Sequence, residues 1–355
     1  HTTGARNIAI GSNAMDDTNA GSNSLNSSDN IFIGNHAGAG TWTDVLSQYN
    51  IGIGTNTLDG NLDGADYNVM IGYGAGTSIT TADKSIGIGG SALLSATTSN
   101  LNTAVGFEAG VSLTTGAGQN TFLGYQAGRQ ATTTTYSVFI GAFAGYNQSI
   151  ASNGNVHIGW AAGQYASGSN NTFVGQEAGQ GGTTSAPFSS GEGNTAIGKA
   201  ALDKFTTGDN NVAVGMNALG ALTTANNNIG IGQGAGDVIT TGGANILIGS
   251  DAGGSITTDQ YVTIVGYSSG QYMEAGNGNR YNSYFGATAG YRGGPGIHQT
   301  YIGGEAGTYA TGSYNTFVGS QTGKGGTTSA PYSSGQYNTA IGYEALEDFT
   351  TGHSN

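Results

Sequence analysis

A short apolar motif recurs along the whole chain, and this repetition constrains the fold more than any single residue does. The motif reads N-h-x-h-G-x-x-A-[G/L], where h is an apolar residue, as in NTAIGYEAL from Asn338 and NTAIGKAAL from Asn194. Its steps are mostly 16 to 18 residues, with a few of 20 and three of 23. A period this short corresponds to one solenoid coil, because a helical-hairpin repeat needs more than about 30 residues. The motif glycines are Gly11, Gly34, Gly54, Gly72, Gly89, Gly106, Gly124, Gly141, Gly159, Gly175, Gly198, Gly215, Gly232, Gly249, Gly266, Gly286, Gly303, Gly319 and Gly342.

The residues around each glycine predict a strand and a corner. The segment before it is short and β-branched, as at 8–10 and 212–214, and no stretch sustains a helical period. The glycine suits a corner where positive φ or close chain approach excludes a side chain. The asparagine that opens the motif suits a turn or stacking on the asparagine of the next coil. We therefore expect an all-β, parallel β-solenoid (β-roll) of about 18–19 coils, mostly 17 residues each.

The repeats run through residues 1–355 as a single array. Within it, residues 164–211 and 308–355 align without gaps at 32 of 48 positions, which indicates duplication of a multi-coil block. Both ends of the sequence fall at the same point of the repeat and show no polar capping coil, which solenoids normally require. We therefore expect an uncapped segment of a longer fibre.

The predicted strands are apolar on both faces. Successive strand residues face opposite sides, so the two h positions share one face and the residue between them occupies the other. That middle residue is mostly apolar, and His157 is the clear polar exception. Strands buried on both faces need a cover on each. We expect another copy to cover the middle-position side in a homotrimer, the alternative being a second strand of the same coil. The aromatic residues expected at this subunit or inter-coil contact are Phe32, Phe122, Phe139, Phe173, Tyr284, Tyr301 and Phe317.

The composition argues against several function classes. The net charge is -13, with only eight Lys and Arg, so the chain lacks the basic patch that nucleic-acid binding needs. The acidic balance also disfavours docking on anionic membranes, and no apolar run reaches the roughly 18 residues that span a bilayer. There is no Cys, which excludes disulfides and thiolate metal sites and fits an extracellular protein.

The motif resembles repeats of known attachment proteins. The segments NIAIGSNA, SIGIGGSAL and NVAVGMNAL resemble the head repeats of trimeric autotransporter adhesins. The longer form, NTAIGYEAL followed by FTTG, is similar to repeat arrays of phage tail fibres. This resemblance implies a left-handed, trimeric parallel β-roll used for attachment at a cell surface or on a virion tail fibre. The adhesin repeat is shorter than the step found here, so the cross-section of the coil must differ.

Three functions are compatible with such a coil. The first is a structural extracellular fibre or adhesin segment, a stiff shaft that displays loops to a host-cell glycan, protein or surface. The second is a subunit of a self-assembling filament or sheath, which predicts head-to-tail polymers. The third is an ice-binding solenoid, because pairs of Thr recur at the coil period, although several coils lack them. We expect no enzyme activity, because the five His and the recurring Glu108, Glu177, Glu305 and Glu344 form no recognisable catalytic set.

The sequence contains one candidate metal site and four candidate loops for ligand contact. Asp59, Asp63 and Asp66 lie close together and are the one candidate Ca²⁺ site, against the alternative of a solvated turn; we expect no other cofactor. Four long steps, at residues 39–49, 181–193, 271–281 and 325–337, predict loops that bulge from the coil.

Two sets of aromatic residues are candidates for contact with sugars. Tyr272, Arg280 and Tyr281 lie in or beside a glycine-rich long step and are the residues we expect to face a ligand. A second set follows the corner glycine and either contacts sugars or packs between coils or subunits: Tyr73, Phe107, Tyr125, Trp160, Tyr267 and Tyr343.

Overall fold

The computed structural model describes residues 4–18, 26–43, 45–148, 152–182, 189–273, 280–326 and 333–354. Two compact units divide the chain. Unit 1 comprises His1–Val174 with Ala186–Phe188, and unit 2 comprises Gly175–Ser185 with Ser189–Asn355. Parts of the long steps at 181–193, 271–281 and 325–337 lie outside the described residues, as does His1.

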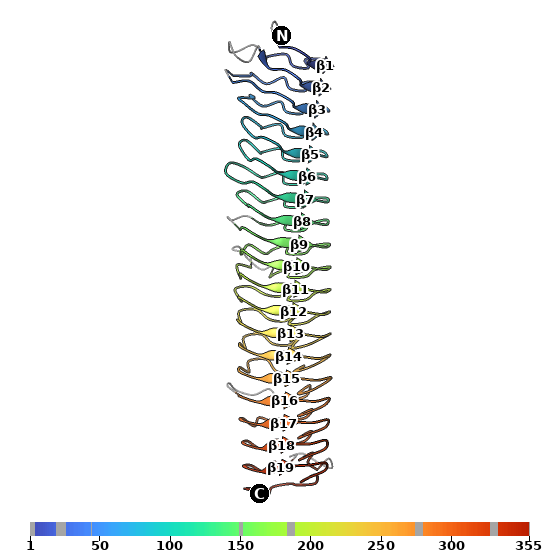
Figure 1. Cartoon of the computed structure of the whole chain (residues 1–355), viewed down its shortest axis with the longest axis vertical. Coiled ribbons are helices and arrows are strands. Elements are labelled where there is room, and N and C mark those ends of the chain that lie inside the picture. The colour runs from blue at the N-terminus through green and yellow to red at the C-terminus, as the bar shows by residue number, and fades with distance from the viewer. Residues whose placement is uncertain are drawn as a thin grey trace. The chain divides into compact units, whose positions relative to one another are not determined.

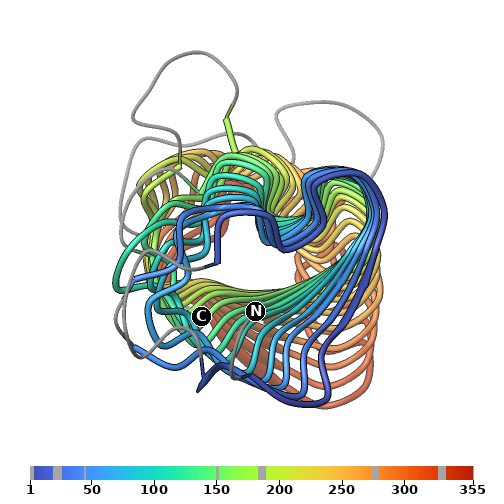
Figure 2. The ribbon, with the colours of Figure 1, turned by 90° about the horizontal axis from the view of Figure 1, so that it is seen from above.

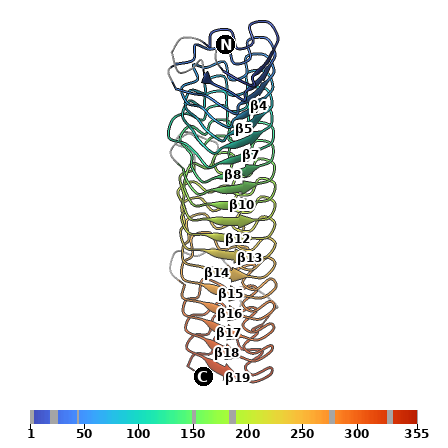
Figure 3. The ribbon, with the colours of Figure 1, turned by 45° about the horizontal axis from the view of Figure 1, so that its top comes forward.

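Each unit is a parallel β-solenoid, which confirms the predicted fold class. Every strand has three residues and pairs in parallel with the strand of the next coil in the same unit, so that Ile229 lies beside Ile246 and Val212 beside Ile229. The labelled strands follow one another along a single side of each unit (Figures 1 and 3). The strands of unit 1 are β1 (Ile8–Ile10), β2 (Ile31–Ile33), β3 (Ile51–Ile53), β4 (Val69–Ile71), β5 (Ile86–Ile88), β6 (Thr103–Val105), β7 (Thr121–Leu123), β8 (Val138–Ile140), β9 (Val156–Ile158) and β10 (Thr172–Val174). Those of unit 2 are β11 (Thr195–Ile197), β12 (Val212–Val214), β13 (Ile229–Ile231), β14 (Ile246–Ile248), β15 (Thr263–Val265), β16 (Ser283–Phe285), β17 (Thr300–Ile302), β18 (Thr316–Val318) and β19 (Thr339–Ile341).

The motif glycines form the corners, with φ between 126° and 144°. A Cβ on Gly232 would lie 2.5 Å from the carbonyl of Gly249 in the next coil, so this corner combines a left-handed backbone with a close approach of two chains. Successive coils can then follow nearly the same path, as the view from above shows for each unit (Figure 2).

The motif asparagines stack inside the coils as a hydrogen-bonded ladder. In unit 2 the Asn228 side-chain Nδ2 donates to Asn211 Oδ1 (3.2 Å) and to the carbonyl of Gly242 (3.0 Å), and its Oδ1 accepts from the backbone N–H of Asn245 (3.1 Å). All three asparagines are fully buried. One side chain thus ties together neighbouring coils and satisfies backbone groups that would otherwise be buried without partners.

The middle residue of each strand lies inside its own coil, so the expected orientation of the strand was wrong. In every strand except β1, the middle residue is buried and the two flanking residues are not. Phe32, Phe122, Phe139, Phe173, Tyr284, Tyr301 and Phe317 are all fully buried and pack between coils of one chain. The Phe122 and Phe139 rings, for example, stack with centroids 5.2 Å apart. The face that would need a partner is therefore the opposite one, formed by the h positions.

The interior has room for these rings because a second motif position compensates for their size. Six residues after a large middle residue the chain has Gly, as in Phe139/Gly145 and Tyr301/Gly307; six after a small one it usually has Leu, as in Ala213/Leu219. A Cβ on Gly145 would lie 2.6 Å from Phe139 Cδ2. Ala104/Gly110 and Gly230/Gly236 depart from the pairing, and there a side chain of the next coil occupies the space. A Cβ on Gly110 would lie 2.7 Å from the Phe122 ring, and a Cβ on Gly236 would lie 2.4 Å from Leu247 Cδ1. The two positions thus fill one core.

Candidate functional site

The strongest candidate for a functional site is the outward-facing side of the strands, which we call the outer face. Alternate residues of each coil build it in four columns. Column A contains the residue two positions before each strand. The two strand columns contain the first and the third residue of each strand. Column B contains the second residue after each strand, which directly follows the corner glycine. In the coil of β13 these residues are Asn227, Ile229, Ile231 and Gln233.

Large apolar side chains gather on the outer face. In the part of the chain that the structure describes, every exposed large apolar side chain except Val45, Leu46 and Tyr272 belongs to one of the four columns. The third residue of every strand is apolar, such as Ile231, whereas the first is Ile or Val in ten strands and Thr or Ser in nine. Columns A and B supply most of the exposed aromatic rings. Large exposed apolar patches are uncommon on monomeric proteins, so the outer face of each unit is a candidate interaction site.

The same face is nearly free of charge. Its charged residues are Arg6, Asp29 and Lys84 in column A and Lys199 in column B, with Asp29 the only acidic one. The chain holds 21 Asp and Glu, so almost all of its acidic charge lies elsewhere. Interfaces between proteins are depleted of charge and enriched in aromatic residues at their centre. The outer face has the composition of such an interface.

Column A of unit 2 carries a continuous stack of rings. Tyr261, Tyr281, His298, Tyr314 and Tyr337 follow one another with centroids 5.2, 5.1, 5.3 and 4.9 Å apart and nearly parallel planes. The column residues have positive φ, near 49° to 60°, which repeats one side-chain direction from coil to coil. The ring faces therefore contact each other, and the ring edges face outward.

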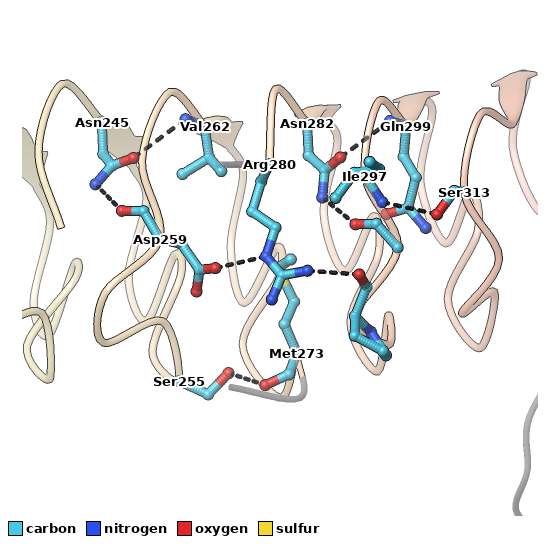
Figure 4. Close-up of polar contacts among 12 residues, drawn as sticks. Asn245, Ser255, Asp259, Val262, Met273, Arg280, Asn282, Ile297, Gln299 and Ser313 are labelled. Carbon is cyan, nitrogen blue, oxygen red and sulfur yellow. Dashed lines mark hydrogen bonds and ion pairs between the residues drawn. The ribbon is translucent and has the colours of Figure 1, made fainter. Parts of the chain in front are cut away.

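The expected ligand-facing set is only partly exposed. Tyr272 and Tyr281 are 53% and 49% exposed, and Tyr281 belongs to column A. Arg280 is buried instead, so this expectation was wrong: its Nε donates to Asp259 Oδ1 at 2.5 Å, and its guanidinium also donates to the Pro295 carbonyl (Figure 4). Burial raises the pKa of the Asp259 carboxyl, and the contact with Arg280 opposes that rise. The pair holds neighbouring coils together inside unit 2.

Asp59, Asp63 and Asp66 do not form a group that could hold a metal ion. Asp66 Oδ1 accepts the backbone N–H of Gln48 at 2.6 Å, and the backbone N–H of Asp66 donates to Asp83 Oδ1 at 2.7 Å, so Asp66 is part of a second ladder along a turn. Burial raises the pKa of both Asp59 and Asp66. No three His, Asp or Glu side chains among the described residues come together as a metal site would require.

The remaining polar candidates also have structural partners. Glu108 accepts from Arg129 Nε at 2.7 Å, which lowers the pKa of this carboxyl, and Glu305 pairs with Lys324 at 2.7 Å. The first Thr of a pair bonds to the next coil, as Thr223 Oγ1 does to the Thr240 carbonyl at 3.1 Å. The second, such as Thr224, is exposed, so each such coil offers one outward Thr of the pair.

His157 lies between two phenylalanines in the core of unit 1. Its ring stacks on Phe139 and Phe173, with centroids 4.9 and 5.0 Å away, and neither ring nitrogen has a hydrogen-bond partner in the described residues. Complete burial lowers the pKa of this imidazole to about 3. The side chain is a neutral core residue rather than an accessible acid or base.

The chain matches no protein-family model and no curated protein sequence. Among the described residues, no helix has the length and hydrophobicity to cross a bilayer. The outer face is thus the feature on which a function can be argued. The sequence predicted a partner on the middle-residue side of the strands, and the structure places that side inside the coil. The paired sizes of the middle residue and the residue six later carried the missing signal.

Proposed function

We propose that the chain is a structural segment of an extracellular fibre or adhesin, in which copies associate through the outer face. The observation that carries this proposal is the apolar, charge-depleted outer face itself. The parallel coil supplies stiffness, because within each unit neighbouring coils are hydrogen-bonded by strand pairing and, at many coils, by the asparagine ladder. The resemblance of the motif to trimeric adhesin heads and tail fibres supports three copies as the assembly.

The size of the face supports a stable association. Six extended residues span about 20 Å, and neighbouring strands lie about 4.8 Å apart. The nine coils of unit 2 therefore present on the order of 850 Å². Stable complexes bury about 800 Å² on each partner. One unit alone offers enough surface for a specific interface.

The proposal is tested by placing charge on the outer face. Ile231, 37% exposed in a strand column, becomes glutamate in the variant I231E. The matched control is Thr224→Glu, because Thr224 is exposed seven residues earlier and lies off the outer face. We expect I231E to weaken self-association measured by sedimentation while its circular dichroism stays unchanged, since a carboxylate must be desolvated in the interface. Equal association of both variants would contradict the proposal.

Attachment is the second part of the proposed role. Host-cell glycans, proteins or surfaces are the partners that a displayed fibre would meet, and among the described residues Tyr272 is the exposed aromatic residue off the outer face. Binding of the assembled chain to a glycan array, compared with Tyr272→Ala, tests this part. Loss of signal in the variant supports a contact through Tyr272, and unchanged binding excludes it.

A further inference from the structure

The two edges of the outer face differ in a way that indicates how copies meet. In unit 2, column A carries the ring stack, and Tyr281, His298 and Tyr314 occupy the coils of β16, β17 and β18. Column B has Ala287, Gly304 and Ser320 in the same three coils. One edge is thus bulky where the other is small.

The small residues of column B leave open space at the surface of the coil. A Cβ on Gly304 would have its nearest heavy atom, Ser320 Oγ, 4.0 Å away, and the backbone of Gly304 lies outside the left-handed region. Rings therefore fit over this stretch of column B. At the neighbouring coils of β15 and β19, Tyr267 and Tyr343 are 63% and 70% exposed and bound the small stretch at its two ends.

In unit 1, too, a bulky residue at one edge of a coil stands opposite a small residue at the other edge, and either edge can carry the bulky one. Column A has Tyr136 where column B has Ala142, and one coil later column A has Gly154 where column B has Trp160. Tyr136 and Trp160 are 66% and 47% exposed. The bulky residue therefore changes edge between these two coils, and the small residue changes with it. Some coils have a ring at both edges, as at Tyr261 and Tyr267 in unit 2, so ring-on-ring contact belongs to the same interface.

Column A and column B of one chain cannot pack against each other. Columns A and B are six residues apart at opposite ends of the strand, or about 20 Å of extended chain. Rings of column A contact each other along the column, as Tyr281 and His298 do, and so do Phe107 and Tyr125 in column B. Tyr125 also contacts Phe143, and among the described residues no ring contact joins the two columns. The matching sizes therefore gain contact only between copies.

We propose that column A of one copy packs against column B of a second copy that runs in the same direction. This inference rests on the self-association proposed above and specifies its geometry. Copies arranged around an axis along the coil place the A edge of each beside the B edge of the next. Antiparallel copies related by a twofold axis would instead set A against A, which presses the ring ladder on itself. The two edges of unit 2 carry Lys199 and no acidic residue, so like charges do not oppose the contact.

Disulfide trapping tests the edge pairing, and the chain has no Cys to interfere. One variant carries Tyr314→Cys in column A together with Ser320→Cys in column B. A disulfide needs Cα atoms within about 7 Å, so these two positions cannot bridge within a chain. We expect oxidation to give covalent dimers and larger closed species on a non-reducing gel. Neighbouring coils lie close together along the solenoid axis, so the column B residue that meets residue 314 can belong to the adjacent coil. A second variant therefore pairs Tyr314→Cys with Gly304→Cys. Pairing of column A with column B predicts cross-linking in at least one of these two variants.

The controls separate this inference from the proposed function. Tyr314→Cys alone should give no covalent dimer, and Tyr314→Cys with Thr224→Cys, which lies off the outer face, should give none either. Dimers from Tyr314→Cys alone would show A on A and overturn the inference. An oligomer that cross-links in neither A–B variant would overturn the edge pairing and leave self-association standing. A monomer by light scattering would overturn both.

Discussion

The size compensation inside the coil predicts a strong coupling between Phe139 and Gly145. Replacing Phe139 with Ala should cost about 3–5 kcal/mol, because the ring is fully buried and stacked on both sides. Replacing Gly145 with Leu alone should also destabilise the fold, because its Cβ would lie 2.6 Å from the Phe139 ring. Overpacking costs about 1–3 kcal/mol, and a side chain at this positive φ of 57° costs about 1–2 kcal/mol more.

The double variant F139A/G145L recreates the Ala213/Leu219 pair that unit 2 already contains. Leu219 has a φ of 49° and is fully buried, so leucine is compatible with this backbone. The leucine should fill the space left by the ring, and the double variant should lose only the strain of about 1–2 kcal/mol and some packing. The single losses sum to at least about 5 kcal/mol, so we expect a favourable coupling energy of at least about 3 kcal/mol, measured by chemical denaturation of the four proteins in the cycle. Additive losses would refute the claim that both positions fill one core.

Three further predictions follow from the described contacts. His157 is neutral in the folded protein, where its pKa is about 3, below the unfolded value. Wild type should therefore lose up to about 1.4 kcal/mol of stability per pH unit as the pH falls from about 6.5 toward 3. His157→Phe should remove this part of the acid sensitivity in denaturation curves, and identical pH profiles of the two proteins would contradict this prediction. Gly232→Ala should abolish or strongly weaken folding, judged by thermal melts, while Gly326→Ala, with open space and an ordinary φ, should melt like wild type; equal melting temperatures would refute the corner argument. Asn228→Val should cost about 2–4 kcal/mol, because the buried Gly242 carbonyl and Asn245 N–H of the next coil lose their partner, while Asn211 Oδ1 still accepts the backbone N–H of residue 228; a neutral effect on denaturation would show that the ladder contributes little.

The coil and its corners were predictable from the sequence because a short period with a fixed glycine has few physical solutions. The φ of each motif glycine and the parallel register follow directly from that period. The stacked asparagines were predictable for the same reason, since identical residues at a constant step must lie above one another. Thus the features that repeat strictly are the ones that the sequence specifies.

The orientation of the strand was predicted the wrong way round, because alternation alone does not say which face is inside. We expected the aromatic residues of the middle position on the side that another copy covers. The structure accommodates them because Gly stands six residues later, as in Tyr301/Gly307, where a Cβ would lie 2.4 Å from the ring. Reading the two positions together would have identified the core. The burial of Arg280 was missed because its partner Asp259 is 21 residues away, in another coil.

The most direct test of the account is the solution mass of the unmodified chain, measured by light scattering over a range of concentrations. One chain has a mass of 35.4 kDa. We predict a discrete species of three times that mass, as expected if the outer face is buried between copies. A mass that grows without limit with concentration would indicate the filament instead, and a single chain at all concentrations would contradict the central claim that the outer face is an interface between copies.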